Sequence, residues 1–156
     1  MTKYFYSGLL AVAVVGIMGI FFYTTVSLEK LSAHTAEFGG VSLKIEYATT
    51  EAQKEKGLSG RENIPDDYGM LFIFKEDSLH GFWMKDMLVP VDIFWLDAQG
   101  HVVSISQNVA TSTYPSVLYP IVSARYVLET AEGFAKKHDI TIGTLLRLKN
   151  PPNVSQ

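Results

Sequence analysis

A short aromatic segment holds the densest group of side chains with chemical potential. Residues 82–86 read Phe-Trp-Met-Lys-Asp. If this segment is extended, Trp83 and Lys85 project from the same face, because side chains alternate along a strand. An indole beside an ammonium can stack on a ring or sugar face while the cation holds an anionic group. The alternative is that Trp83 packs in the core and Lys85 pairs with an acid at the surface.

Asp92 is the second feature, because it interrupts the otherwise apolar run 89–96. An unpaired buried carboxylate is costly, so Asp92 is expected to have a partner. Arg61, Lys85 and Arg125 are the candidates, and a satisfied Asp–Arg pair would act as a structural pin. The other reading is a binding or acid/base role, in which either arginine holds a carboxylate of a ligand.

His80, Met84 and Met87, with Met70 as a neighbour, form a softer set. Imidazole and thioether groups suit Cu(I), so copper handling is one hypothesis. Methionines are also common gap fillers in cores. An extended segment would place His80 and Met84 on one side and Met87 on the other, which favours packing. We therefore predict no metal site and no bound cofactor.

Motifs of nucleophilic and nucleotide chemistry are missing from the sequence. There is no cysteine, Gly-x-Ser-x-Gly elbow, phosphate-binding loop or His-Glu-x-x-His motif. The lack of cysteine also excludes disulfides and thiolate metal sites. The sequence thus favours binding over catalysis and predicts no catalytic residue. A hydrolase-like enzyme that uses Asp92 with Lys85 or Arg125 is the alternative.

The composition predicts one globular domain with a membrane component. The chain has 156 residues, of which 47% are hydrophobic and 19% charged, too apolar for a disordered protein. Beyond Lys30 it carries 11 basic and 15 acidic residues, a net charge of −4. Nucleic acid is not an expected partner, because nucleic-acid binders carry a basic surface.

An uncharged stretch near the N-terminus predicts a transmembrane helix. Residues 4–28 contain no charged side chain, and as a helix they would extend about 37 Å, enough to cross a hydrocarbon core of about 30 Å. Lys3 and the terminal amine favour a cytoplasmic N-terminus. A cleaved signal peptide, the alternative, has a shorter apolar core of about 7–15 residues. We expect a single-pass anchor in the cell membrane, a tether over 29–40 and an extracytoplasmic domain over 41–149.

The exported part has the pattern of a β-rich α+β domain. Apolar and polar residues alternate over 41–47, which predicts a strand. Thr50 and Gln53 form a capping-box pattern before a short helix that ends at Gly57. Further strands are predicted over 69–74, 80–84, 91–96, 101–106, 124–130 and 145–148, with a hairpin loop over 97–100. The pattern also predicts an irregular connection over 107–123, a helix over 131–138 and a disordered tail over 150–156. The expected architecture is a small, mostly antiparallel sheet or partly closed barrel with two short helices.

Six segments in this order resemble the DUF192 family, also called UPF0127. They are KGLSGRENIP (56–65), GMLFIF (69–74), GFWMKDM (81–87), VPVDIFWLDAQGHVV (89–103), ARYVLE (124–129) and GFAKKHDITIG (133–143). The resemblance covers about 41–148 and implies a compact β-rich domain with short helices and no assigned activity. Relatives often have Asn-Thr where this chain has Asp86-Met87, and some have cysteines in the segment that matches 107–123.

Together these observations predict a ligand- or partner-binding module of the cell envelope. The expected ligand-binding residues are Arg61, Trp83, Lys85, Asp92 and Arg125. The expected partners are the membrane and an envelope small molecule, glycan or peptide.

Overall fold

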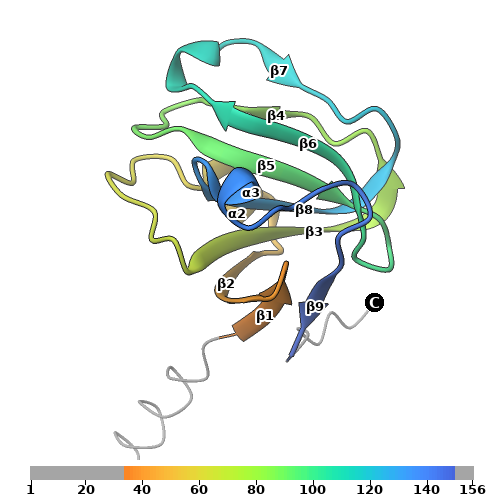
Figure 1. Ribbon diagram of the computed structural model, residues 1–156. Helices are drawn as coiled ribbons and strands as arrows, with labels where there is room; N and C mark the ends of the chain where they lie inside the picture. Colours follow the sequence, from red (N-terminus) through yellow and green to blue (C-terminus); the bar gives the residue numbers. More distant parts are fainter. Residues whose placement is uncertain (1–33, 150–156) are drawn as a thin grey trace, which may run out of the picture. The chain divides into compact units, whose positions relative to one another are not determined.

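The computed structural model describes residues 34–149, which form a β-rich domain with two short helices (Figure 1). The predicted anchor over 4–28 and the predicted tail over 150–156 lie outside the described residues. Within 34–149, no helix is long and apolar enough to cross a bilayer. The strands are β1 (His34–Phe38), β2 (Val41–Ala48), β3 (Tyr68–Ser78), β4 (Phe82–Trp83), β5 (Val91–Leu96), β6 (Val102–Val109), β7 (Val117–Leu118), β8 (Ala124–Ala131) and β9 (Leu146–Leu148), and the helices are α2 (Glu51–Lys56) and α3 (Phe134–Lys137).

Seven strands form one mixed, curled sheet in the order β6-β5-β8-β3-β2-β1-β9. β2 and β3 are parallel and are joined by a crossover that contains α2, while the other neighbours are antiparallel. The two edges approach each other: the Val102 N–H donates to the Thr144 carbonyl at 2.9 Å, and the Leu146 N–H donates to the Gly100 carbonyl at 2.9 Å. The sheet is therefore a half-barrel, as the partly closed barrel of the sequence prediction implies.

The predicted tether over 29–40 is wrong for its last part, because 34–38 form β1. This strand pairs with both β2 and β9. Its buried residues, Ala36 and Phe38, alternate with exposed Glu37. Gly39 and Gly40, both with positive φ, then form the turn into β2, as expected of a Gly-Gly hairpin. The domain thus includes 34–38.

Local sequence signals correctly predicted α2 and the β5–β6 hairpin. The Gln53 N–H donates to Thr50 Oγ1 at 3.3 Å, and the Thr50 N–H donates to Gln53 Oε1 at 3.0 Å, which completes the capping box. In the hairpin, Asp97 Oδ1 accepts the N–H groups of Gln99 and His101 at 2.9 and 2.8 Å.

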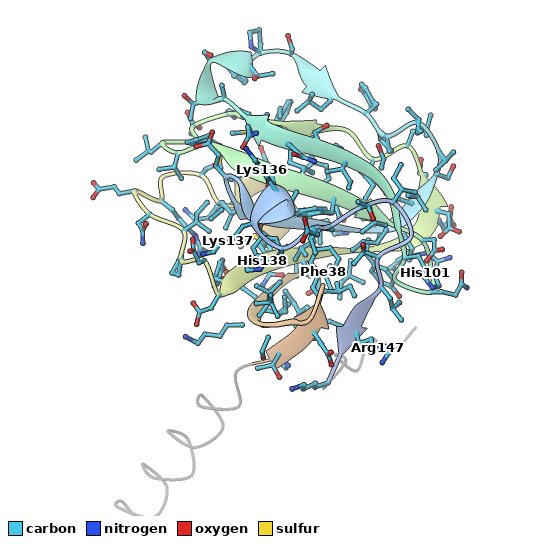
Figure 2. All side chains as sticks on the ribbon, in the orientation of Figure 1. Phe38, His101, Lys136, Lys137, His138 and Arg147 are labelled. Atoms are coloured by element: carbon cyan, nitrogen blue, oxygen red, sulfur yellow. The ribbon has the colours of Figure 1, made fainter. Side chains whose placement is uncertain are left out.

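Two predicted segments differ in extent from the structure. The helix expected over 131–138 is the single turn α3, with Lys136 and Lys137 in it (Figure 2). The connection expected over 107–123 is partly regular, because β6 continues to Val109 and β7 pairs with β4.

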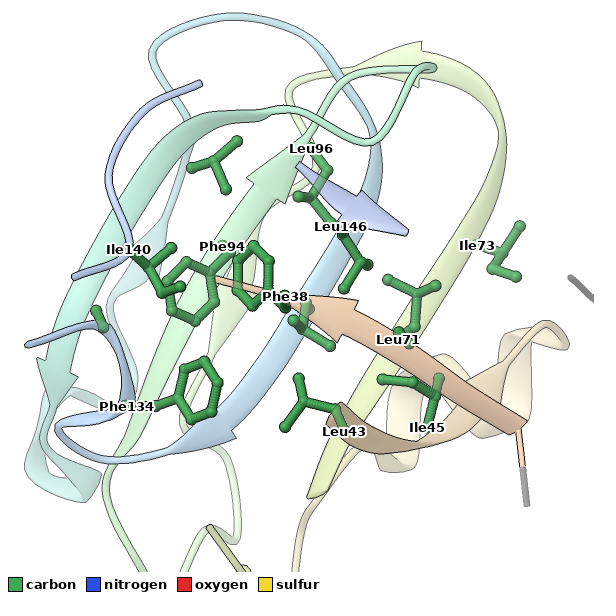
Figure 3. Close-up of a cluster of buried hydrophobic side chains, with 14 residues drawn as sticks. Phe38, Leu43, Ile45, Leu71, Ile73, Phe94, Leu96, Phe134, Ile140 and Leu146 are labelled. Carbon is green, nitrogen blue, oxygen red and sulfur yellow. The ribbon is translucent and has the colours of Figure 1, made fainter. Parts of the chain in front are cut away.

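The curled sheet separates two hydrophobic cores. β5 is buried along its whole length, and its side chains alternate between the cores. Phe94 packs with Phe38 and Phe134 inside the curl (Figure 3). Trp95, from the opposite face of β5, packs with Phe82. Side chains inside the curl are therefore separated by the sheet from side chains outside it.

Candidate functional site

Asp92 is fully buried, and its partners are backbone groups. Its Oδ1 accepts the Asn108 N–H at 2.7 Å and its Oδ2 accepts the Ala135 N–H at 2.8 Å. The prediction that an arginine or lysine pairs with Asp92 is therefore wrong. A carboxylate that accepts two N–H groups is satisfied without a cation. Asp92 thus pins the end of β6 and the start of α3 to β5.

The two arginines expected near Asp92 pair with other acids. Arg61 donates from Nη2 to Glu46 Oε2 at 2.9 Å and from Nη1 to the Tyr68 hydroxyl at 2.8 Å. Burial raises the pKa of Glu46, but its hydrogen bonds with Tyr68 and Arg61 outweigh this effect and lower the pKa. Arg125 donates from Nε to Asp77 Oδ1 at 2.5 Å. The structure therefore does not bring Arg61 and Arg125 together with Asp92.

Trp83 and Lys85 lie beside a loop that follows α2. Trp83 is 45% exposed, and Lys85 is also exposed. Ser59 Oγ donates to the Lys85 carbonyl at 2.8 Å, and the Gly60 N–H donates to the Asp86 carbonyl at 2.9 Å. These two bonds join the loop 57–60 to the segment 83–86, so both segments hold their side chains around one hollow.

The hollow has an inner and an outer part, which we together call the cleft. The inner cavity has a volume of about 60 Å³ and is lined by 54–59, 81–83, Phe72, Met87 and Glu129. The outer part is a shallow hollow of about 450 Å³ lined by Ala52, Glu55, Lys56, Ser59, Gly60, Lys85 and Asp86. Glu55, Lys56 and Ser59 line both parts. Trp83 therefore borders the inner part, and Lys85 borders the outer part.

Glu129 lies at the floor of the inner cavity. It pairs in register with Met70 of β3 and Ile93 of β5, and both neighbours belong to the core outside the curl. Only 4% of Glu129 is exposed. Its Oε2 has no hydrogen-bond partner among residues 34–149. A buried polar atom without a partner is costly, so its position requires an explanation.

Burial raises the pKa of the Glu129 carboxyl to about 8, although the charge of Arg61 acts in the opposite direction. The guanidinium of Arg61 is already bonded to Glu46 and Tyr68. At neutral pH, Glu129 is therefore mainly an uncharged acid, able to donate a hydrogen bond or to release a proton. Strongly perturbed carboxyls in clefts are typical of functional sites.

Gly57 keeps the space above Glu129 open. Its φ of 47° is unfavourable for other residues. A Cβ at this position would lie 3.3 Å from Phe72 Cζ and 3.8 Å from Glu129 Oε2. A side chain would therefore project toward the floor of the cavity.

The inner cavity is where four of the six segments of the family resemblance meet. Its lining comes from 56–59, Phe72, the segment 81–87 and Glu129, in addition to Lys54 and Glu55. Sequence reasoning did not select Glu129, because a lone acid in a predicted strand usually faces solvent. The available signal was its position in a largely apolar strand, which in the structure is buried on both faces of the sheet.

The described residues offer little for a metal. His80 stacks on Phe74 with ring centroids 3.5 Å apart, and burial lowers its pKa. Met84 and Met87 are buried in the core outside the curl. No group of three or more His, Cys, Asp or Glu side chains within 34–149 could hold a metal ion. These contacts favour the packing interpretation of the histidine and methionines.

Comparison with known proteins gives a family and two similar structures. A candidate transcription regulator from Sinorhizobium meliloti is 26% identical, with a TM-score of 0.69 over 74% of this chain and 92% of that chain. A protein of unknown function from Novosphingobium aromaticivorans is also 26% identical, with a TM-score of 0.67 over 72% of this chain and 83% of that chain. No curated protein matches. The family model described as DUF192, uncharacterized ACR, COG1430, matches residues 34–148, and the chain therefore belongs to the DUF192 family.

Proposed function

We propose that this protein is a membrane-anchored, extracytoplasmic module that binds a small ligand of the cell envelope in the cleft. The observation that carries the proposal is the Glu129 carboxyl, whose buried Oε2 lacks a partner within 34–149, at a cavity that Trp83 also lines. Ligand sites commonly combine an apolar lining with a few polar groups that fix orientation. The cleft has this composition.

The walls of the inner cavity supply the apolar contact. Phe72 and Phe82 are buried, and Trp83 presents a partly exposed indole at the same cavity. The outer hollow adds two basic residues, Lys56 and Lys85, and two acidic residues, Glu55 and Asp86. A ligand with an apolar or ring-shaped body and polar ends, such as a sugar, a peptide end or a small amphipathic metabolite, matches these surfaces.

Binding is better supported than the alternatives. The hydrolase hypothesis needs Asp92 near Lys85 or Arg125, but both oxygens of Asp92 accept backbone N–H groups. Copper handling needs an accessible His80 with thioethers, but Met84 is only 1% exposed. The similar structure from Sinorhizobium meliloti is described as a candidate regulator of transcription. The net charge of −4 beyond Lys30 does not favour DNA as a partner here.

The test of the binding function is a thermal-shift screen followed by calorimetry. The full-length protein in a non-ionic detergent is screened against envelope sugars, short peptides and small amines, because a ligand of the folded state raises its melting temperature. Affinity is then measured for wild type, Trp83→Ala and Ile142→Ala. Ile142 is a matched control, since it is 65% exposed and lines neither part of the cleft.

Loss of aromatic contact is worth about 0.5–1.5 kcal/mol, so Trp83→Ala should weaken binding roughly 2- to 12-fold. Ile142→Ala should bind as wild type does. Identical affinities for all three proteins would contradict a site at Trp83.

The anchor is tested separately by carbonate washing of membranes, in which the full-length protein should stay in the pellet. Recovery in the supernatant would contradict the proposed placement.

A further inference from the structure

At the floor of the cleft, Glu129 Oε2 lacks a hydrogen-bond donor within 34–149. Glu129 has Met70 and Ile93 as its lateral neighbours in the sheet, and the Cβ-free Gly57 and the ring of Phe72 lie near its carboxyl. These neighbours offer no side-chain hydrogen-bond donor, and Oε2 has none within the described chain. A donor for Oε2 must therefore come from elsewhere, and the inner cavity is the space that adjoins this carboxyl.

Two of the cations near the carboxyl already have other partners. Lys54 lines the inner cavity, but its Nζ contacts Glu51 Oε1 at 3.0 Å and lies 4.6 Å from the centroid of the Phe74 ring. Arg61 is bonded to Glu46 and Tyr68. Lys56 also lines the inner cavity, but no ion pair within 34–149 joins it or another cation to Glu129. The carboxyl is thus left without a paired positive charge.

We infer that the group bound at the floor is the primary ammonium of a small amine, held by the Glu129 carboxylate, with the body of the amine beside Trp83. This inference rests on the proposed binding function and names its ligand class. An ammonium supplies compact donors, and hydrogen bonds between two charged groups are about twice as strong as neutral ones. The inner cavity of about 60 Å³ accepts such a group more readily than a bulky one.

Binding is accompanied by loss of one proton from the protein. The carboxyl O–H bond of Glu129 breaks, its proton passes to solvent, and the amine enters already protonated and remains so. The complex then contains one carboxylate and one ammonium. Since only the ionised carboxyl binds the ammonium well, affinity rises with pH until Glu129 is ionised in the free protein.

The experiment compares n-butylamine with 1-butanol, two probes of similar shape that differ in charge. NMR titrations of the full-length protein in detergent follow the amide signals of Gly57 and Trp83 at pH 6 and pH 8. With a pKa of about 8, the ionised fraction of Glu129 rises from about 1% to about 50% between these pH values, so affinity for butylamine should rise about 50-fold. Affinity for butanol should not rise.

Glu129→Gln removes the ionisable group and should abolish both the pH dependence and the preference for butylamine. The amide spectrum of the variant shows whether it folds. If the variant does not fold, the comparison of butylamine with butanol on wild type tests the ammonium inference. Equal affinity of wild type for both probes at pH 8 would overturn the ammonium inference, as would an unchanged pH dependence in a folded Glu129→Gln variant. If a ligand from the screen still depends on Trp83, the cleft remains a binding site and only the ammonium is rejected. If neither probe shifts these signals, the inference is also rejected.

Discussion

Replacing Glu129 by glutamine should stabilise the protein at neutral and alkaline pH but not at acidic pH. The carboxyl is buried, and its pKa is raised from an ordinary value of 4.5 to about 8. The folded state therefore binds this proton more tightly than the unfolded state does. The stability that protonated Glu129 contributes is fully present below about pH 4.5 and is lost as the pH rises through 8.

The size of the effect follows from the width of this pH window. At about 1.4 kcal/mol per pKa unit, the free energy of unfolding of wild type should fall by about 5 kcal/mol across the window and by about 3 kcal/mol between pH 4.5 and pH 7. Glutamine has the shape of the protonated acid but does not titrate. Its stability relative to wild type should therefore increase by these amounts as the pH rises.

Urea denaturation of both proteins from pH 4 to pH 9 measures this difference. Other acids titrate in both proteins, so their contributions cancel in the comparison. Glu132→Gln is the matched control, because Glu132 is an exposed carboxyl that follows β8 directly. A stability difference between wild type and Glu129→Gln that stays constant over the whole range would refute the reasoning.

Two further substitutions test contacts that hold the fold together. Asp92→Ala leaves the N–H groups of Asn108 and Ala135 without their acceptors. At about 1–3 kcal/mol for each group, the free energy of unfolding in urea should fall by roughly 2–6 kcal/mol, and a loss below 1 kcal/mol would show that Asp92 is not a pin. Thr50→Ala removes half of the capping box with Gln53. It should cost about 1 kcal/mol in the same assay, and an unchanged midpoint would show that α2 does not depend on this cap.

The sequence predicted those elements whose causes are local. The alternation over 41–47 requires one buried face, and the structure places it in β2 with Leu43 and Ile45 buried. The hydrogen bonds of the α2 capping box and of the Asp97 turn join residues at most four positions apart. Such signals can be recognised in one short segment.

Pairings between distant segments could not be predicted in the same way. The parallel register of β2 with β3 and the pairing of β4 with β7 join segments that no local pattern relates. The partners of Asp92 are backbone N–H groups, which carry no residue identity that a sequence could reveal. The strand β1 is short, and its buried Ala36 gave only a weak hydrophobic signal.

The candidate site shows the same division. Trp83 and Lys85 were predicted to mark a ligand platform, and the structure places them beside two adjoining hollows; their role in binding stays a prediction. Glu129 was not selected, because its burial depends on β3, β5 and the loop after α2 together. A buried acid is expected to have a partner, and only the assembled fold shows that Oε2 has none within 34–149.

The most direct measurement of the central claim is an NMR titration of the Glu129 side-chain carboxyl carbon in the ligand-free protein. The buried, unpaired carboxyl at the floor of the cleft should titrate near pH 8. A midpoint at or below about 4.5, the ordinary value for glutamic acid, would mean that Glu129 is solvated or paired in solution. That result would contradict the account of the cleft as a binding site built around this acid.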